Sequence, residues 1–397
     1  MRSISAVRAP YVAPVPGQLA EMREEMEEYN RSPAALAGME GAMRTARTSL
    51  YPYVAGARDR HAMAARIMCA QESTHLRQAR LYYADSETTA ATLAAAATAP
   101  GEAVSAARPP SPSGMIVFES PLGWAETQTG LPGGADGGPP VVAIPIVAAT
   151  WSLWTPAQTP IAGSATQWVA NTAFGREVCE PHLQGLWVTF YTAAGAMYRA
   201  LDPRTLVSVS APDGEAITAG QMDAALTRAG RPALSWENET VLQVGRRFPS
   251  GKAALGVTGS WSEALYTAWQ LMAQSGRHAW IETETITRTR AGRRRDRRAG
   301  ITASGDVHVV RLRANRRPSA GRTGAPGEHP ASEYRWEVPP YRSPNRCLDS
   351  HRHATGGCTH EERIIGPHIN GPKDAPVRKL RGPVYLWDEV PSEAHSR

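Results

Sequence analysis

Residues 141–154 have the sequence VVAIPIVAATWSLW, an apolar run rich in valine and isoleucine. Such a composition predicts a β-strand. Pro145 has no amide hydrogen to donate to a neighbouring strand, so it indicates a sheet edge or a bulge. Two further strand-like runs flank this one, MIVFES at 115–120 and LQGLWVTFYTAAG at 183–195. Together the three runs predict a central domain that contains a sheet.

Upstream of this region the apolar residues follow a helical period. In the stretch 17–29 they lie on one predicted helix face with glutamates opposite, and helical patterns continue over about 33–49 and 57–84. Alanine, proline and serine then dominate, which is typical of a helix end that leads into an exposed linker. We therefore expect a helical N-terminal region over residues 1–100 and a linker over 101–114.

The clearest helical pattern of the central domain, 115–284, is TGSWSEALYTAWQLMAQSG at 258–276. Ser260 and Glu263 have the spacing of a capping box, which predicts where the helix begins. One apolar stripe is expected to pack in the core: Trp261, Leu265, Trp269 and Met272.

Three short runs near the C-terminus alternate apolar with polar or basic side chains: DVHVVRLR at 306–313, EYRWEV at 333–338 and GPVYLW at 382–387. The alternation predicts strands of a half-exposed sheet. We expect a small β-rich module over residues 331–390. The predicted fold class is α+β, with a helical N-terminal region, a central mixed α/β domain and a basic C-terminal module.

The basic charge of the chain is concentrated in one segment. The formal net charge is +6, and residues 285–322 contain twelve arginines but only Asp296 and Asp306 as acids. We expect an Arg-rich flexible segment over 285–330, and such a segment favours a polyanionic partner. The alternative is a solvated arginine loop that binds nothing. The arginines expected to contact phosphates are Arg293, Arg294, Arg295, Arg297 and Arg298.

Aromatic and basic residues are interleaved downstream of this segment. Arg335 precedes Trp336, and Tyr341 precedes Arg342. Aromatic rings stack on unpaired bases, which is a common way for proteins to bind single-stranded RNA. These four residues therefore favour RNA as the partner. The alternative for Trp336 is burial in the core face of its strand.

Residues 347–360 have the sequence CLDSHRHATGGCTH, which holds two of the four cysteines and three of the eleven histidines. Thiolates and imidazoles are ligands that Zn²⁺ prefers, although the spacing differs from that of a standard zinc finger. The candidate ligands of a structural zinc are Cys347, His351, His353, Cys358 and His360. One alternative is a polar hairpin with incidental thiols. Another is a catalytic metal site of a nuclease, in which His353 or His360 acts with the later His368 and Asn370.

Common enzyme motifs find no support in the sequence. It contains no G-x-S-x-G nucleophile elbow and no glycine-rich dinucleotide fingerprint. GRRFPSGKA at 245–253 differs from a phosphate-binding loop in its glycine spacing, and HEERI at 360–364 lacks the second histidine of a zinc-protease helix. We therefore expect binding rather than catalysis.

No apolar run reaches the length of a signal-peptide core or of a membrane helix. We therefore expect a cytoplasmic protein without membrane contact. In that reducing compartment, cysteines are more commonly thiols or metal ligands than disulfides. Cys69 and Cys179 stand alone in their segments and are expected to be inert core residues.

The order of several motifs resembles that of known proteins. VFESPLGWAE at 117–126 is followed by SWSEALYTAWQLM at 260–272, then by the arginine-rich segment with VHVVRLR, and last by the stretch from YRWEVPPYRS to RGPVYLW. Over about residues 115–387 the chain resembles a family of uncharacterised proteins of actinobacterial type, found on chromosomes, plasmids and phages. It is also distantly similar to the anti-CRISPR family that represses synthesis of the type V-A effector nuclease.

The anti-CRISPR resemblance implies recognition of a nascent effector polypeptide and loss of its messenger RNA. It also implies a C-terminal part rich in arginine, histidine and tryptophan. Where a stretch of the R-G-H-W type is expected, this chain has RSPNRCLDSHRHATGGC at 342–358, without the tryptophan and with two cysteines. The resemblance assigns no catalytic residue, and a shared fold does not require a shared target.

These observations predict a nucleic-acid-associated protein of mobile-element or anti-CRISPR-like type, with RNA as the favoured partner. A ribonucleoprotein or a nascent polypeptide is an alternative partner. One alternative function is a protein-interaction module with a structural zinc loop, in which the acidic helix at 17–29 docks a partner. The other is a metal-dependent nuclease.

Overall fold

A mixed sheet forms the centre of the protein's first unit, Met1–Asn315, and a second unit comprises Arg316–Arg397. Nine strands of this sheet lie among the residues that the computed structural model describes. Those residues are 6–98, 103–128, 141–156, 166–172, 175–209, 216–248, 257–274, 280–313, 335–338, 341–347, 360–370 and 377–378.

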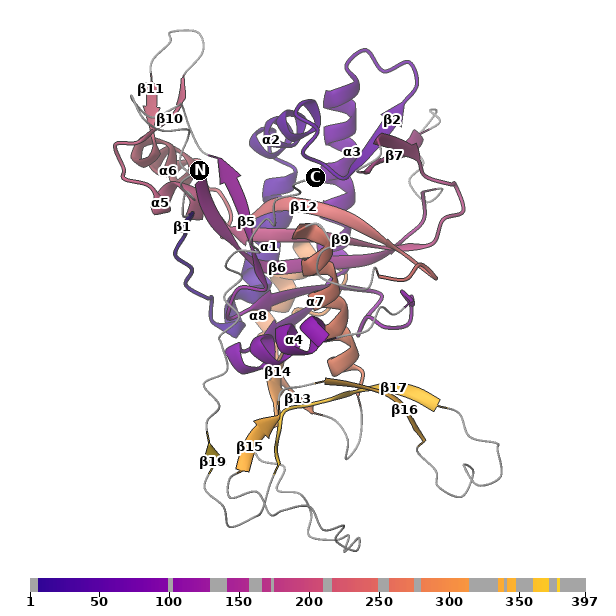
Figure 1. Ribbon diagram of the computed structural model, residues 1–397. Helices are drawn as coiled ribbons and strands as arrows, with labels where there is room; N and C mark the ends of the chain where they lie inside the picture. Colours follow the sequence, from indigo (N-terminus) through magenta and orange to yellow (C-terminus); the bar gives the residue numbers. More distant parts are fainter. Residues whose placement is uncertain are drawn as a thin grey trace, which may run out of the picture. The chain divides into compact units, whose positions relative to one another are not determined.

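Seven strands of the sheet follow the order β12-β9-β6-β4-β3-β14-β13 (Figure 1). β3, β4 and β14 are parallel to one another, and the other neighbours along this path are antiparallel. Two further strands pair with the first half of β6, β1 (Val7–Arg8) and β5 (Gly123–Gln128). The seven strands are β3 (Arg80–Ala84), β4 (Ser113–Phe118), β6 (Val141–Trp154), β9 (Gly185–Ala193), β12 (Leu234–Gln243), β13 (Ile281–Ile286) and β14 (Val307–Leu312).

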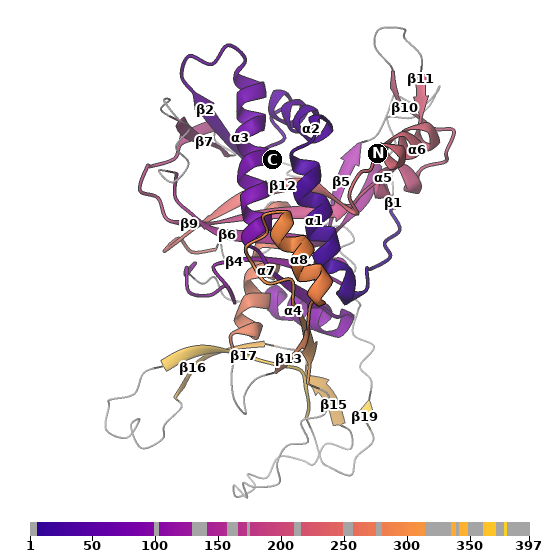
Figure 2. The same cartoon turned by 180° about the vertical axis from the view of Figure 1, so that it is seen from behind.

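Helices cover both faces of this sheet, as the two opposite views show (Figures 1 and 2). The face turned to the viewer in Figure 2 carries α1 (Leu19–Asn30), α3 (Arg60–Gln78) and α8 (Arg290–Arg298). The other face carries α4 (Ser86–Thr98) and α7 (Val257–Met272). The mixed sheet with its helices confirms the predicted α+β class.

Side chains alternate between the two helical layers, as the pleat of a strand requires. On β3, Leu81 and Tyr83 belong to the core shared with α1, whereas the ring of Tyr82 stacks against Trp151. Trp151 in turn contacts Trp269 of α7, with ring centroids 5.2 Å apart. Trp261, Leu265 and Trp269 are all buried, as predicted for the core stripe of α7, whereas its fourth member, Met272, is only partly buried.

Smaller elements surround the central sheet. A three-stranded sheet, β2-β7-β8, and a two-stranded sheet, β10-β11, lie beside it. Three tryptophans pack edge to face where the three-stranded sheet meets β6 and β9: Trp154, Trp168 and Trp187. The elements are η1 (Pro16–Gln18), α2 (Pro33–Arg44), β2 (Leu50–Val54), β7 (Thr166–Thr172), β8 (Gly175–Val178), α5 (Ala196–Ala200), β10 (Leu206–Val209), β11 (Ala216–Thr218) and α6 (Ala219–Arg228).

The second unit contains short strands. β15 (Arg335–Val338) pairs with β18 (His368–Asn370) and with β19 (Val377–Arg378), and β16 (Tyr341–Cys347) forms an antiparallel pair with β17 (His360–Ile365). The predicted strand at 333–338 therefore corresponds to β15. The predicted strand at 382–387 lies outside the described residues.

The N-terminal hundred residues differ from the predicted separate helical region. The pattern over 57–84 suggested one helix, but α3 ends at Gln78 and β3 begins at Arg80, between β4 and β14. A five-residue strand is too short for its period of two to be distinguished from the preceding helix. The region therefore supplies an inner strand of the sheet.

The predicted linker and flexible segment also differ from the structure. Ser111 and Ser113 are buried, and the Ser111 carbonyl accepts a hydrogen bond from the Trp151 indole at 2.9 Å. Within 285–330, the first part folds as the end of β13, α8 and β14. Buried partners hold the described parts of both stretches, 103–114 and 285–313, in spite of their polar composition.

Two details of the predicted elements have different outcomes. The pairing of β6 with β9 shifts register between Ile146 and Ala148, directly after Pro145, which confirms the predicted bulge. α7 begins at Val257, so Ser260 lies in its first turn and is not its N-cap, and the predicted capping box is wrong.

Candidate functional site

Helix α8 carries the five arginines that were expected to contact phosphates. Its N-cap is Thr289, whose hydroxyl accepts the Gly292 amide at 3.1 Å. Gly292 and Asp296 form the buried side of the helix, and a Cβ at position 292 would collide with the side chain of Arg288. The arginines of the last turn lie where the helix dipole favours positive charge. The segment is thus an anchored helix.

Ion pairs attach α8 to the acidic helix α1. Arg288, just before α8, pairs with Glu21, with Glu24 at 2.6 Å and with Asp296 at 3.1 Å. Arg295 pairs with Glu21 at 2.8 Å and with Glu24 at 3.1 Å. Two of the five glutamates of the acidic helix α1, Glu21 and Glu24, are therefore engaged by α8 and Arg288 of the same chain. Docking of a partner by α1 stays a prediction.

The remaining arginines of α8 are exposed and form what we call the α8 arginine face, although Arg293 also donates to the Arg288 carbonyl. All five are exposed, and none makes an ion pair with a residue that the structure describes. Because Asp296 is buried against Arg288, no acid of α8 offsets their charge. The members of the α8 arginine face are Arg290, Arg293, Arg294, Arg297 and Arg298.

The expected stacking residues occupy two separate small sheets of the second unit. Arg335 and Trp336 lie on β15, and Tyr341 and Arg342 lie on β16. Their stacking on bases stays a prediction.

The predicted zinc ligands are only in part described. Cys347 ends β16 and His360 begins β17, and the two are directly opposite each other in the strand pairing. His351, His353 and Cys358 lie outside the described residues. Within the described ranges, no group of three or more potential metal ligands comes together.

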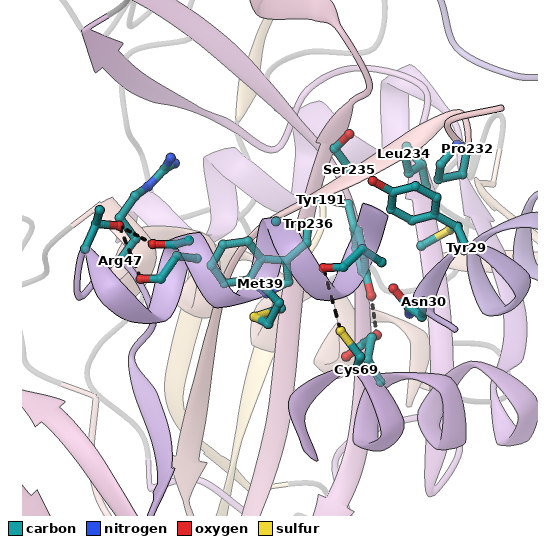
Figure 3. Close-up of a pocket in the computed structure, with 17 residues that line it drawn as sticks. Tyr29, Asn30, Met39, Arg47, Cys69, Tyr191, Pro232, Leu234, Ser235 and Trp236 are labelled. Carbon is teal, nitrogen blue, oxygen red and sulfur yellow. Dashed lines mark hydrogen bonds between the residues drawn. The ribbon is translucent and has the colours of Figure 1, made fainter. Parts of the chain in front are cut away.

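A pocket of about 550 Å³ lies between α1, α2, α3 and β12 (Figure 3). Its walls are mostly apolar, with Met26, Met39 and Trp236 among them, and the small residues of α2 leave room beneath that helix. The polar groups Cys69, Glu72 and Tyr191 also line the pocket. An apolar cavity with a few polar groups is the usual form of a small-molecule site.

Glu72 is the charged group of this pocket, and its side chain is only 8% exposed. Its carboxylate accepts hydrogen bonds from Thr150 at 3.0 Å, from Thr189 at 2.8 Å and from the Tyr191 hydroxyl. Burial raises the pKa of Glu72, but His75 and the hydroxyl donors outweigh this effect, so the pKa lies below its ordinary value. Glu72 is therefore ionised at neutral pH.

The strand register explains why these hydroxyls converge. Thr150 of β6 pairs with Thr189 of β9, and Thr189 pairs with Glu239 of β12, so the three side chains form a row on one sheet face. Tyr191 lies two residues further along β9 and therefore on the same face. α3 crosses this row and places Glu72 above it.

Glu239 is a second buried carboxyl group next to this row. One of its oxygens accepts the Leu50 amide at 2.9 Å, and the other has no hydrogen-bond partner among the described residues. Burial raises the pKa of Glu239 to about 8. The two carboxyl groups thus have pKa values displaced in opposite directions, which is common in functional sites.

The described cysteines fit their predicted role as core residues. Cys69 is buried and donates to the Ala35 carbonyl at 3.9 Å, and burial raises its pKa to about 12. Burial also raises the pKa of Cys179. A thiol that stays protonated is a poor nucleophile, so Cys69 contributes to the pocket wall rather than to chemistry.

The sequence analysis did not single out Glu72, Tyr191 or Glu239. The sequence could have indicated that Glu239 is buried, because WENETVLQ is strand-like and Glu239 is at one of its core-facing positions. At Glu72 the signal was a charge next to Cys69 and Met68 on the apolar side of a helix. A buried charge is informative only when its burial is known, which requires the tertiary structure.

Comparisons with protein-family models, curated proteins and solved structures found no match. The resemblances inferred from the motif order stay predictions. None of the helices in the described part of the chain is long and apolar enough to cross a membrane.

Proposed function

We propose that the protein binds nucleic acid, with RNA favoured, through the α8 arginine face. The observation that carries the proposal is the one-sided helix itself. Its acid is buried, and the five arginines of the α8 arginine face are exposed and make no ion pair with a described residue. Guanidinium groups bind phosphate oxygens through paired hydrogen bonds, and a row of them follows a phosphate backbone. A cytoplasmic location is part of the proposal.

The anchoring of α8 supports this function. Arg288 and Arg295 attach the helix to α1, so the exposed arginines are held in one orientation before a polyanion arrives. Pre-organisation lowers the entropy cost of binding. Binding through phosphates is largely independent of sequence and depends strongly on salt.

The test compares two variants that lose the same charge. In the first, Arg290, Arg294, Arg297 and Arg298 are changed to Gln, which keeps helix propensity and leaves the α1 contacts in place. The control changes four exposed arginines outside α8 to Gln: Arg58, Arg66, Arg228 and Arg246. Fluorescence anisotropy with a labelled single-stranded RNA would be measured over a range of salt concentrations.

The α8 variant should lose affinity for all RNA sequences alike, and the slope of log K against log salt should shrink by about 3. The control should keep a slope close to that of the wild type. Equal losses in both variants would mean that only net charge matters. A wild-type protein that binds no RNA at about 50 mM salt would contradict the proposal.

We also propose a structural zinc in the second unit, supported by the pairing of Cys347 with His360. Two ligands directly across a strand pair are a suitable half of a tetrahedral site. Elemental analysis of protein purified without a histidine tag should give one zinc per chain, and Cys347→Ser should lower that content. Substoichiometric metal in the wild type would contradict this assignment. Metal-dependent RNA cleavage in the same sample would favour the nuclease alternative.

A further inference from the structure

The pocket of Figure 3 is formed by elements other than the exposed arginines of α8, so it is an independent site. Its walls come from the end of α1, the inner side of α2, part of α3 and the start of β12. Tyr29 and Trp236 contribute aromatic rings, and Met26 and Met39 contribute flexible apolar side chains. A ligand that fills this space needs an apolar body.

The charge in the pocket is negative. Three donors to Glu72 are neutral hydroxyls, which orient the carboxylate without carrying a charge of their own, and His75 is a further group that lowers its pKa. Arg47, at the rim, has a side chain that is 57% exposed and lies 3.8 Å from Glu237, so its charge is matched there. The His75 Nδ1 atom lies 3.7 Å from Glu72, but His75 does not line the pocket.

We propose that this pocket binds a small organic cation, a primary amine on an apolar or aromatic body, with its ammonium group at Glu72. A buried carboxylate is stable when a cation pairs with it, and a ligand ammonium would supply that pairing together with a donor. The rings of Tyr29 and Trp236 suit a cationic ligand, because aromatic faces attract positive charge. An anionic ligand would be repelled by Glu72.

Helix α2 gives a way to close the pocket without touching Glu72. Gly38 lines the pocket, and a Cβ added there would meet nothing within 4 Å. Gly38 is also exposed, so Gly38→Phe adds a bulky side chain at the solvent side of the pocket. Phe is more favourable than Gly in a helix. Ala37, the preceding residue, is exposed and does not line the pocket, so Ala37→Phe is the matched control.

The experiment measures binding of phenethylamine by calorimetry, with 2-phenylethanol as a neutral analogue and 3-phenylpropionate as an anionic one. We expect phenethylamine to bind wild type and Ala37→Phe at least tenfold more tightly than the alcohol, with no binding of the anion. Gly38→Phe should abolish amine binding. If Glu72→Gln folds, its affinity for phenethylamine should fall to its affinity for 2-phenylethanol.

Equal affinity for the amine and the alcohol would overturn the proposal, because the pocket would then be only an apolar cavity. Unchanged amine binding by Gly38→Phe would also overturn it, since the amine would then bind elsewhere. A wild-type protein that does not bind phenethylamine would overturn the proposal as well. Should Glu72→Gln fail to fold, the comparison of Gly38→Phe with Ala37→Phe and the three probes still decides the question.

Discussion

Two buried charges on the same face of the sheet are stabilised in different ways. Arg288, with a side chain 7% exposed, is surrounded by the carboxylates of Glu21, Glu24 and Asp296. Glu72, with a side chain 8% exposed, is surrounded by hydroxyl groups. The first charge is neutralised by opposite charges, and the second is mainly solvated by oriented neutral dipoles.

The difference shows which cluster depends on a partner. The Arg288 cluster is complete within the chain, since Arg288 and Arg295 pair with Glu21, Glu24 and Asp296 and attach α8 to α1. The Glu72 cluster places a carboxylate, held by hydroxyl groups and by His75, next to a cavity that a cation could enter. We therefore assign a structural role to the first cluster and a binding role to the second.

The largest effect is expected when the central cation of the first cluster is removed. Arg288→Met leaves Arg295 paired with Glu21 and Glu24 but removes the ion-pair partner of the buried Asp296. Breaking a buried ion pair on one side costs about 3–5 kcal/mol of unfolding free energy. Urea denaturation would measure it. Arg44→Met is the control, because Arg44 pairs with Glu40 and Asp59 at the surface and should cost less than about 1 kcal/mol. Similar losses in both variants would remove the distinction between the clusters.

The second prediction concerns pH and the carboxyl group beside the hydroxyl row. Because the pKa of Glu239 is raised to about 8 in the folded state, the fold binds its proton more tightly than the unfolded chain does. Its contribution is complete below the unfolded pKa and is lost as the pH rises through about 8. The loss between pH 5 and 8 is on the order of 3 kcal/mol.

Glu239→Gln should remove this part of the pH dependence, while Glu72, with a lowered pKa, contributes a flat profile over the same range. Urea midpoints at several pH values between 5 and 8 would be compared for the variant and the wild type. Parallel profiles of the two proteins would show that Glu239 is already ionised at pH 5.

The smallest effect is expected from one hydroxyl of the second cluster. Thr189→Val removes a donor to Glu72 and the acceptor of the Trp187 indole, which should cost about 1–3 kcal/mol of unfolding free energy. Thr267→Val is a matched control, because Thr267 is fully buried and its hydroxyl has no partner among the described residues. That replacement should be neutral or stabilising. If Thr189→Val were equally harmless, the hydroxyls would not stabilise Glu72.

The sequence predicted those elements whose pattern is long and regular. The strand at 141–154, its bulge after Pro145 and the buried stripe of α7 are all present. The short strand β3 was missed, because five residues do not establish a period and the preceding helix dominates the window. The mistake over the N-terminal region follows directly from that missed strand.

The candidate sites were predictable to different degrees. The arginine cluster was visible in the composition, but its division into anchoring Arg295 and the exposed α8 arginine face depends on contacts with α1. Glu72 and Glu239 are far apart in the sequence. The register of β9 with β12 brings Glu239 beside Thr189, and α3 places Glu72 above that row. Long-range pairing of this kind leaves no local pattern to detect.

The position of β3 has a consequence for synthesis on the ribosome. β3 emerges early, but β14, one of its two neighbours in the sheet, is encoded by residues 307–312. Until that segment leaves the exit tunnel, one edge of β3 has no strand to pair with, and open edges promote aggregation. Translation that stops before β14 would therefore release a chain with an incomplete sheet, and such fragments should require chaperones to stay in solution.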